Sequence, residues 1–248
     1  MRGKIVMSVG NVVALLAVIV VNYLANAIPF NGQTTGEISD KFDVLFKPAG
    51  YVFAIWGAIY LGLLAFAIYQ VLPSQRESGL LDKIGWYFIL SCLANAVWLY
   101  FWHYEHFLLT VAIMLVLLYS LITLYLRLNI GNQPVQPTMR WLVQVPFSIY
   151  LGWISVATIA NVTIFFASID WNGFGIAPTV WFAVVLLAGL ALALLMSWQR
   201  RDIAYGLVII WAFVGVAVQN AGTSASMLSW SAAVLSVVMV VAGRFLAR

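Results

Sequence analysis

Apolar residues occur along this chain in long, unbroken runs that are separated by short polar islands. Runs such as VVALLAVIVV and VVLLAGLALALL are apolar on every side. Strands of a membrane barrel would instead alternate apolar and polar residues over about 10 positions. The complete apolar segments that contain such stretches are roughly 20 residues long, which is enough for a helix to cross about 30 Å of hydrocarbon. The pattern therefore predicts an all-α integral membrane protein.

We predict about eight transmembrane helices from these runs. They cover residues 5–28, 49–71, 84–102, 106–127, 140–168, 178–197, 203–220 and 224–244. The first five would form one bundle at 1–168, and the last three a transmembrane extension at 169–248. The composition agrees with a membrane protein, because 64% of the residues are hydrophobic and only 8% are charged. Soluble domains carry about 25% charged residues.

The basic residues gather on one side of the predicted spans. If the N-terminus is cytoplasmic, the basic residues on the cytoplasmic side are Arg2, Lys4, Arg76, Lys83, Arg127, Arg140, Arg200, Arg201, Arg244 and Arg248. Only Lys41 and Lys47 then lie outside. The positive-inside rule therefore predicts a multi-pass protein with both termini in the cytoplasm. The plasma, or inner, membrane is the location that we expect. The same bias explains the net charge of +4 without a nucleic-acid partner.

The polar side chains inside the predicted spans are neutral. No Asp, Glu, Lys or Arg lies deep in a span by this assignment, whereas ion paths, proton relays and chromophore counter-ions use such residues. The intramembrane amides are Asn11, Asn22, Asn26, Asn95, Gln144, Asn161, Gln219 and Asn220. Amides join helices or form hydrogen bonds with the polar groups of a ligand.

Cysteine and histidine offer no metal motif. Cys92 is the only cysteine and lies inside the third span, so it forms no intramolecular disulfide. His103 and His106 flank Glu105 at the end of a helical hairpin. A metal site there is one reading, but we interpret the two histidines as solvated polar caps. We therefore predict no metal site, and nothing in the sequence indicates a hydrolytic or transfer site.

Aromatic residues recur at helical spacing on three of the spans. The residues that share these faces are Phe53, Trp56 and Tyr60 in the second span, Asn95 and Trp98 in the third, and Tyr150, Trp153 and Asn161 in the fifth. One such face would be ordinary helix packing. Because the predicted topology directs all three toward the outer half of the membrane, they favour a ligand-binding pocket there.

These motifs resemble those of the translocator protein, or TspO/MBR, family of tryptophan-rich membrane proteins. PAGYVFAIWGAIY is similar to the family pattern P-x-W-V-F-x-x-V-W-x-x-L-Y, and NAVW matches N-x-x-W. The fifth span is similar to the family's Y-L-A-W followed by Asn. Tyr51 replaces the first tryptophan of the pattern, and the spacing from Phe53 to Trp56 is one residue shorter. The resemblance ends near Ile169, so the chain is similar to the longer tryptophan-rich sensory proteins.

The resemblance implies a membrane receptor or carrier for a flat apolar ligand, such as a porphyrin (tetrapyrrole) or a sterol-like lipid. Trp56, Trp98 and Trp153 would stack on this ligand, while Asn95 and Asn161 would form hydrogen bonds with it. No cofactor would be required beyond a bound porphyrin or lipid. Family members are linked to light-dependent porphyrin breakdown at tryptophans that match Trp56 and Trp153, which would be the only enzymatic activity.

Two other classes of function stay open. One is a structural subunit of a larger membrane complex, and the other is a facilitator of small metabolites with a polar path through the bundle. The expected partners are the lipid bilayer, a small apolar ligand, and either a second copy or other membrane proteins. The loop at residues 29–48 either covers the outer mouth as a lid or forms an interfacial half-helix. We interpret the last three spans as a packing or partner-binding extension, with Trp211 and Gln219 as a less favoured second site.

Overall fold

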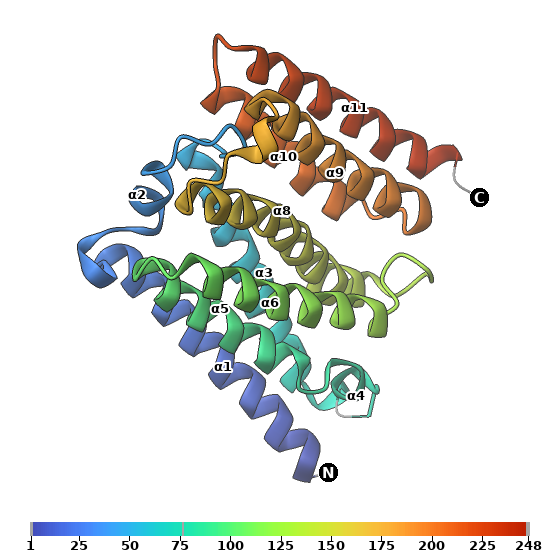
Figure 1. The fold of residues 1–248 in the computed structure, drawn as a ribbon. Coiled ribbons are helices and arrows are strands. Elements are labelled where there is room, and N and C mark those ends of the chain that lie inside the picture. The colour runs from blue at the N-terminus through green and yellow to red at the C-terminus, as the bar shows by residue number, and fades with distance from the viewer. Residues whose placement is uncertain (1, 76, 247–248) are drawn as a thin grey trace.

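The computed structural model describes residues 2–75 and 77–246, and the regular elements in these ranges are all helical (Figure 1). The long helices are α1 (Arg2–Ala27), α3 (Ile55–Val71), α5 (Tyr87–His103), α6 (Phe107–Arg127), α8 (Val145–Ser168), α9 (Pro178–Gln199), α10 (Ile203–Gln219) and α11 (Ser224–Leu246). Six helical segments of the described ranges are long and apolar enough to span a membrane, and α5 and α10 have 17 residues each. The predicted all-α membrane fold is confirmed, and the predicted spans end within a few residues of these helices.

Short helical turns connect or extend the long helices. They are η1 (Phe30–Gly32), α2 (Thr35–Asp40), η2 (Gly50–Ala54), η3 (Pro73–Gln75), α4 (Leu80–Ile84), α7 (Pro137–Met139), the π-helical η4 (Arg140–Gln144) and η5 (Gly173–Gly175). We call the end of the molecule with α2 and η5 the loop end, and the end with α4 and α7 the arginine end.

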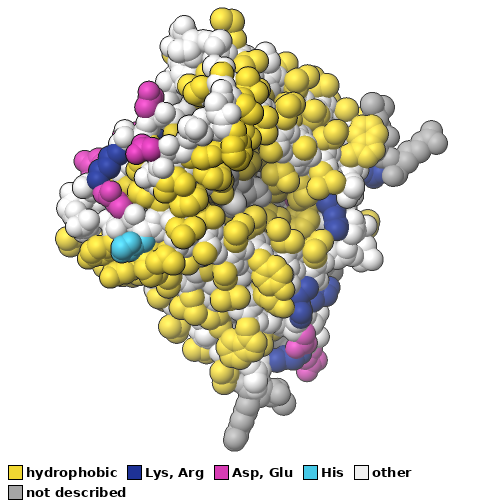
Figure 2. All heavy atoms as spheres, viewed as in Figure 1, with side chains coloured by type: hydrophobic (Ala, Val, Ile, Leu, Met, Phe, Trp, Pro, Cys, Tyr) yellow, Lys and Arg dark blue, Asp and Glu magenta, His cyan; other side chains and the backbone are white. Residues whose placement is uncertain are grey.

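Charged side chains lie mainly at these two ends. Figure 2 shows a largely hydrophobic face with charges at opposite edges, as expected for a protein surrounded by lipid. Three of the basic residues in the charge count fall outside this description: Arg76 and Arg248 lie outside the described residues, and the side chain of Arg2 is not described.

The first five long helices form one bundle, and the last three form a group beside it (Figure 1). In the five-helix bundle, α5 packs between α1 and α6, and α8 packs against α3 and α6. Helix α10 packs against α8 from the other side, and α9 and α11 pack against α10. Helix α10 therefore connects the two groups.

The arginine-end half of the five-helix bundle is filled by side chains. Phe66, Phe88 and Phe147 from three helices meet edge to face, with ring centroids 5.1 to 5.8 Å apart. Asn11 of α1 donates a hydrogen bond from Nδ2 to Gln70 Oε1 at 2.8 Å, and both amides are buried. This packing leaves the loop-end half as the place where the bundle can open.

Hydrogen bonds attach the C-terminal helices to the segment before α3. The Trp211 indole N–H donates to the carbonyl of Val52 at 3.0 Å, and the Ala49 amide donates to the carbonyl of Gly215 at 3.1 Å. The indole of Trp211 therefore helps to hold the two helix groups together.

Alanine substitutions at two glycines would test the contact between the α6–α7 connection and the α9–α10 turn. Gly131 and Gly175 both have a left-handed backbone, with φ of 81° and 74°. A Cβ at Gly131 would lie 2.1 Å from the carbonyl oxygen of Arg200, whereas a Cβ at Gly175 would meet nothing within 4 Å. We expect Gly131→Ala to lower the free energy of unfolding by about 2 kcal/mol more than Gly175→Ala. Thermal unfolding in detergent measures the difference, and equal midpoints for the two variants would contradict this contact.

Candidate functional site

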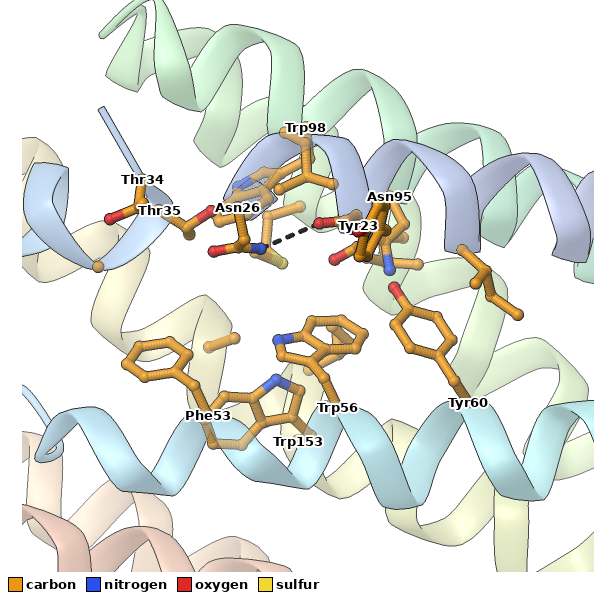
Figure 3. Close-up of a pocket in the computed structure, with 18 of the residues that line it drawn as sticks. Tyr23, Asn26, Thr34, Thr35, Phe53, Trp56, Tyr60, Asn95, Trp98 and Trp153 are labelled. Atoms are coloured by element: carbon orange, nitrogen blue, oxygen red, sulfur yellow. Dashed lines mark hydrogen bonds between the residues drawn. The ribbon is translucent and has the colours of Figure 1, made fainter. Parts of the chain in front are cut away.

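A cavity of about 750 Å³ lies in the loop-end half of the five-helix bundle (Figure 3). We call it the aromatic cavity. Residues of α1, α3, α5, α6 and α8 form its walls, and the start of α2 forms part of its mouth. The described residues that line it include no charged side chain. The cavity is therefore an apolar space with a few neutral polar groups, which is the usual character of small-molecule sites.

The segment η2–α3 supplies one aromatic wall. Phe53, Trp56 and Tyr60 stand three and four residues apart, so they share one face and point into the cavity (Figure 3). The rings of Trp56 and Tyr60 are stacked with centroids 5.4 Å apart. Trp153 of α8 meets Phe53 and Trp56 edge to face, at 5.7 and 6.4 Å. These contacts fix the four rings as a rigid apolar wall.

Amide side chains of α1 and α5 supply the polar part of the opposite wall. Asn22 donates from Nδ2 to Asn95 Oδ1 at 3.4 Å, and Asn95 donates from its own Nδ2 to the hydroxyl of Tyr150 at 2.8 Å. Tyr150 is only 1% exposed and lies behind the wall. The tyrosine therefore orients the Asn95 amide and does not line the cavity.

A second polar chain orients the Trp98 ring. Its indole N–H donates to Asn161 Oδ1 at 2.8 Å, and Asn161 Nδ2 donates to Thr110 Oγ1 at 2.8 Å. Trp98 also stacks on Trp102 with centroids 5.0 Å apart. Asn161 is buried behind Trp98, as Tyr150 is behind Asn95. Of the eight site residues predicted from the sequence, six line the aromatic cavity, namely Phe53, Trp56, Tyr60, Asn95, Trp98 and Trp153.

Several polar groups of the cavity have no hydrogen-bond partner among the described residues, and one of them is the buried hydroxyl of Thr35 at the mouth. The indole nitrogens of Trp56 and Trp153 face the open space (Figure 3), and neither donates to a described acceptor. The hydroxyl of Tyr60 points toward Asn95, but its buried oxygen forms no hydrogen bond. These groups are therefore sites where a bound molecule would gain hydrogen bonds.

A family model for TSPO-like proteins matches residues 6–245. The chain belongs to the TSPO-like family. The match confirms the resemblance drawn from the three aromatic motifs. The expectation that this resemblance ends near Ile169 is wrong, because the match extends over the C-terminal helices as well as the five-helix bundle. Neither the curated proteins nor the solved structures contained a match to the chain.

Sequence reasoning assigned no residue of α1 or of the first loop to the lining of this TSPO-like site. Asn22, Tyr23 and Asn26 line the cavity from α1, and Thr34 and Thr35 line it at the mouth. The four-residue spacing of Asn22 and Asn26 places them on one face, which was a usable signal. Nothing in the sequence indicated that this face would meet α5.

The first loop of the TSPO-like protein lines the mouth of the cavity and contains the short helix α2, which ends at Asp40, before the apolar residues within 42–46 that would have anchored an interfacial half-helix. Thr34 and Glu37 form a capping box at the start of α2, and the hydrogen bonds from Thr34 lower the pKa of Glu37. Ile38 is fully buried against Trp102, whose indole N–H donates to the carbonyl of Thr35 at 3.1 Å. The loop is therefore packed onto α5.

The interpretation of both histidines as solvated caps is wrong for His103. Its ring is fully buried, lies 2.7 Å from the carbonyl of Leu99 through Nδ1, and meets Phe30 edge to face at 5.5 Å. His106 is exposed, as predicted. The difference arises because the first loop folds over the end of α5, which the local sequence does not specify.

Proposed function

We propose that this TSPO-like protein is a receptor or carrier that binds a flat apolar ligand with hydrogen-bond acceptors in the aromatic cavity. A porphyrin, or more broadly a tetrapyrrole, is the first candidate, and a sterol-like lipid is the second. The observation that carries the proposal is the pair of unpaired indole N–H groups of Trp56 and Trp153, which face an apolar cavity of about 750 Å³. Ligand sites typically have volumes of about 300–1,000 Å³.

The chemistry of the lining defines what such a ligand needs. The ring walls favour a planar apolar body, because aromatic pairs gain from offset and edge contacts. The two indoles are donors only, so they require carbonyl, carboxylate or ring-nitrogen acceptors. No charged side chain lies among the described lining residues, so an acidic substituent would be more stable at the open mouth than deep in the cavity.

The packing below the cavity favours binding over permeation. Leu63, Phe66 and Phe147 are at most 1% exposed and fill the bundle between the cavity and the arginine end. A facilitator would need a polar path through this layer. A purely structural subunit would have no need of unpaired donors in a cavity, because buried polar groups of packing surfaces are normally paired. With the loop end outward, as the basic residues predict, the ligand would bind in the outer half of the membrane.

Titration of the detergent-solubilised protein with protoporphyrin tests this proposal. We expect saturable quenching of tryptophan fluorescence at micromolar porphyrin, together with a shift of the porphyrin absorbance band. In the double variant Trp56→Phe/Trp153→Phe, the rings remain but both donors are lost. We expect its affinity to fall about tenfold or more, since each hydrogen bond contributes about 1 kcal/mol. The absorbance band reports binding independently of the number of tryptophans.

Trp230→Phe is the matched control, because it makes the same chemical change at a half-exposed position of α11 that does not line the cavity. Its affinity should equal that of the wild type. If folded protein shows no saturable binding of porphyrin or of a sterol, or if the double variant binds like the control, the proposed ligand class is wrong.

A further inference from the structure

A second cavity of about 670 Å³ lies between α8 and α9, in the loop-end half of the molecule. We call it the α8–α9 groove. The two helices are consecutive in the chain, yet each packs on α10, and α9 diverges from α8 instead of packing along it. None of the residues that line the groove lines the aromatic cavity. The groove is therefore a separate site that belongs to the junction of the two helix groups.

The body of the groove is apolar. The rings of Phe46 and Phe182 meet at 6.5 Å and both residues line the groove. Val162 on the α8 side and Val185 and Ala188 on the α9 side are among its wall residues. Because the groove runs along membrane-spanning helices, its apolar walls lie at the level of lipid hydrocarbon. A lipid acyl chain is therefore the group best suited to fill this space.

The mouth of the groove carries an aromatic cluster and an unpaired carboxylate. Trp171 lies 4.5 Å from the ring of Phe166 and 5.2 Å from that of Trp181, whose indole N–H is held by the carbonyl of Gly173 at 3.0 Å. Asp43 lines the same groove and is exposed. These rings and this carboxylate lie where the headgroup of a lipid would reach.

Asp43 differs from the neighbouring acidic residues of the loop end. Asp40 pairs with Lys47 at 3.0 Å, and Glu105 pairs with Lys41. Within residues 2–75 and 77–246, the Asp43 carboxylate has no ion pair and no hydrogen bond. A carboxylate beside electron-rich aromatic faces attracts ammonium and trimethylammonium groups, and it repels phosphates that carry no compensating cation.

We propose that the α8–α9 groove binds one membrane lipid with an ammonium headgroup. One acyl chain would fill the groove, and the headgroup cation would lie against Trp171 and Asp43. The lipid would come from the leaflet at the loop end, which the basic residues predict to be the outer one. In this position it would fill the space between α8 and α9 and contact both helix groups.

Lipid retention on the purified full chain tests this site. The protein is reconstituted with equal amounts of phosphatidylcholine and phosphatidylglycerol of identical acyl chains, and native mass spectrometry identifies the lipid that stays bound. We expect one retained lipid per chain, with the choline lipid enriched about fivefold. Asp43→Asn should retain a lipid but lose the enrichment. Ala188→Phe should lose the lipid, because its ring would occupy the groove.

Leu187→Phe is the matched control, since it adds a ring to the lipid-facing side of the same helix, where Leu187 is 62% exposed and does not line the groove. It should behave as the wild type. The proposal is overturned if the wild type retains no lipid, if both headgroups are retained equally, or if Ala188→Phe keeps its lipid. If Ala188→Phe fails to fold, the headgroup preference of Asp43→Asn is the deciding measurement, because Asp43 is on the surface and its substitution should not disturb folding. The proposal is then wrong if Asp43→Asn keeps the enrichment of the choline lipid.

Discussion

Asp202→Ala is expected to lower the free energy of unfolding by about 3 kcal/mol or more, because it removes the acceptor of three hydrogen bonds. Asp202 is 8% exposed at the start of α10. Its Oδ2 accepts from the hydroxyls of Tyr125 at 2.8 Å and Ser148 at 2.6 Å, and its Oδ1 accepts from the amide of Tyr205 at 3.1 Å. The carboxylate thus connects α6, α8 and α10 at the arginine end.

The size of this effect depends on the groups that the substitution leaves behind. Without Asp202, two buried hydroxyls lose their partner and α10 loses its N-cap, which alone contributes about 1 kcal/mol. The triple variant Asp202→Ala/Tyr125→Phe/Ser148→Ala removes the orphaned hydroxyls. We therefore expect it to be more stable than the sum of its single changes predicts. Asp202→Asn, which keeps one acceptor oxygen, should be milder.

Thermal unfolding in a fixed detergent compares these variants. The interpretation of Asp202 as a connector is wrong if Asp202→Ala unfolds within a degree or two of the wild type. It is also wrong if the effects of the three substitutions are additive. The result bears on the relation of the two helix groups, because Asp202 reaches from the C-terminal group to helices of the first bundle. A large effect would mean that this connection contributes substantially to the stability of the protein.

Ala157→Trp is expected to weaken porphyrin binding about 100-fold or more, if the proposed ligand site is correct. Ala157 lines the aromatic cavity from α8, one helical turn after Trp153. An indole at this position would occupy the space that the ligand needs. The adjoining cavity, at about 60 Å³, is too small to receive the new ring. The absorbance titration described above measures the loss.

Ala17→Trp is the control for this substitution, because Ala17 is exposed on α1 and lines neither the aromatic cavity nor its small neighbour. It adds the same ring to the lipid-facing surface, so its affinity for porphyrin should be unchanged. Wild-type affinity in both variants would place the porphyrin outside the aromatic cavity. A matching loss in both variants would indicate a general effect of the added ring on folding, which thermal unfolding would show.

The helices could be predicted from the sequence because hydrocarbon leaves the backbone no external partners. Each spanning segment must satisfy its own hydrogen bonds, so the length of an apolar run and the charges beside it determine where a helix begins and ends. The shared face of Phe53, Trp56 and Tyr60 follows from the 3.6-residue repeat in the same way. These properties depend only on residues that are close together in the chain, so they can be predicted from the sequence.

The depth of each side chain within a face could not be predicted in this way. Tyr150 and Asn161 were predicted to contact the ligand, but they lie behind Asn95 and Trp98. Periodicity identifies a face of the helix and does not say which residue on that face stands in front. That order depends on how closely α5 and α8 approach each other, which is set by contacts between residues more than 50 positions apart.

By itself, the sequence determined the membrane-spanning helices, their polar amides and the aromatic faces. Only the tertiary structure decided which indole N–H groups are used in folding. Trp98 and Trp211 donate to Asn161 and to the carbonyl of Val52, whereas Trp56 and Trp153 face the cavity without a described acceptor. The physical reason is that a hydrogen bond requires an acceptor about 3 Å away in space, and separation along the chain does not determine that distance. For Trp98 and Trp211, that acceptor comes from a segment remote in the chain.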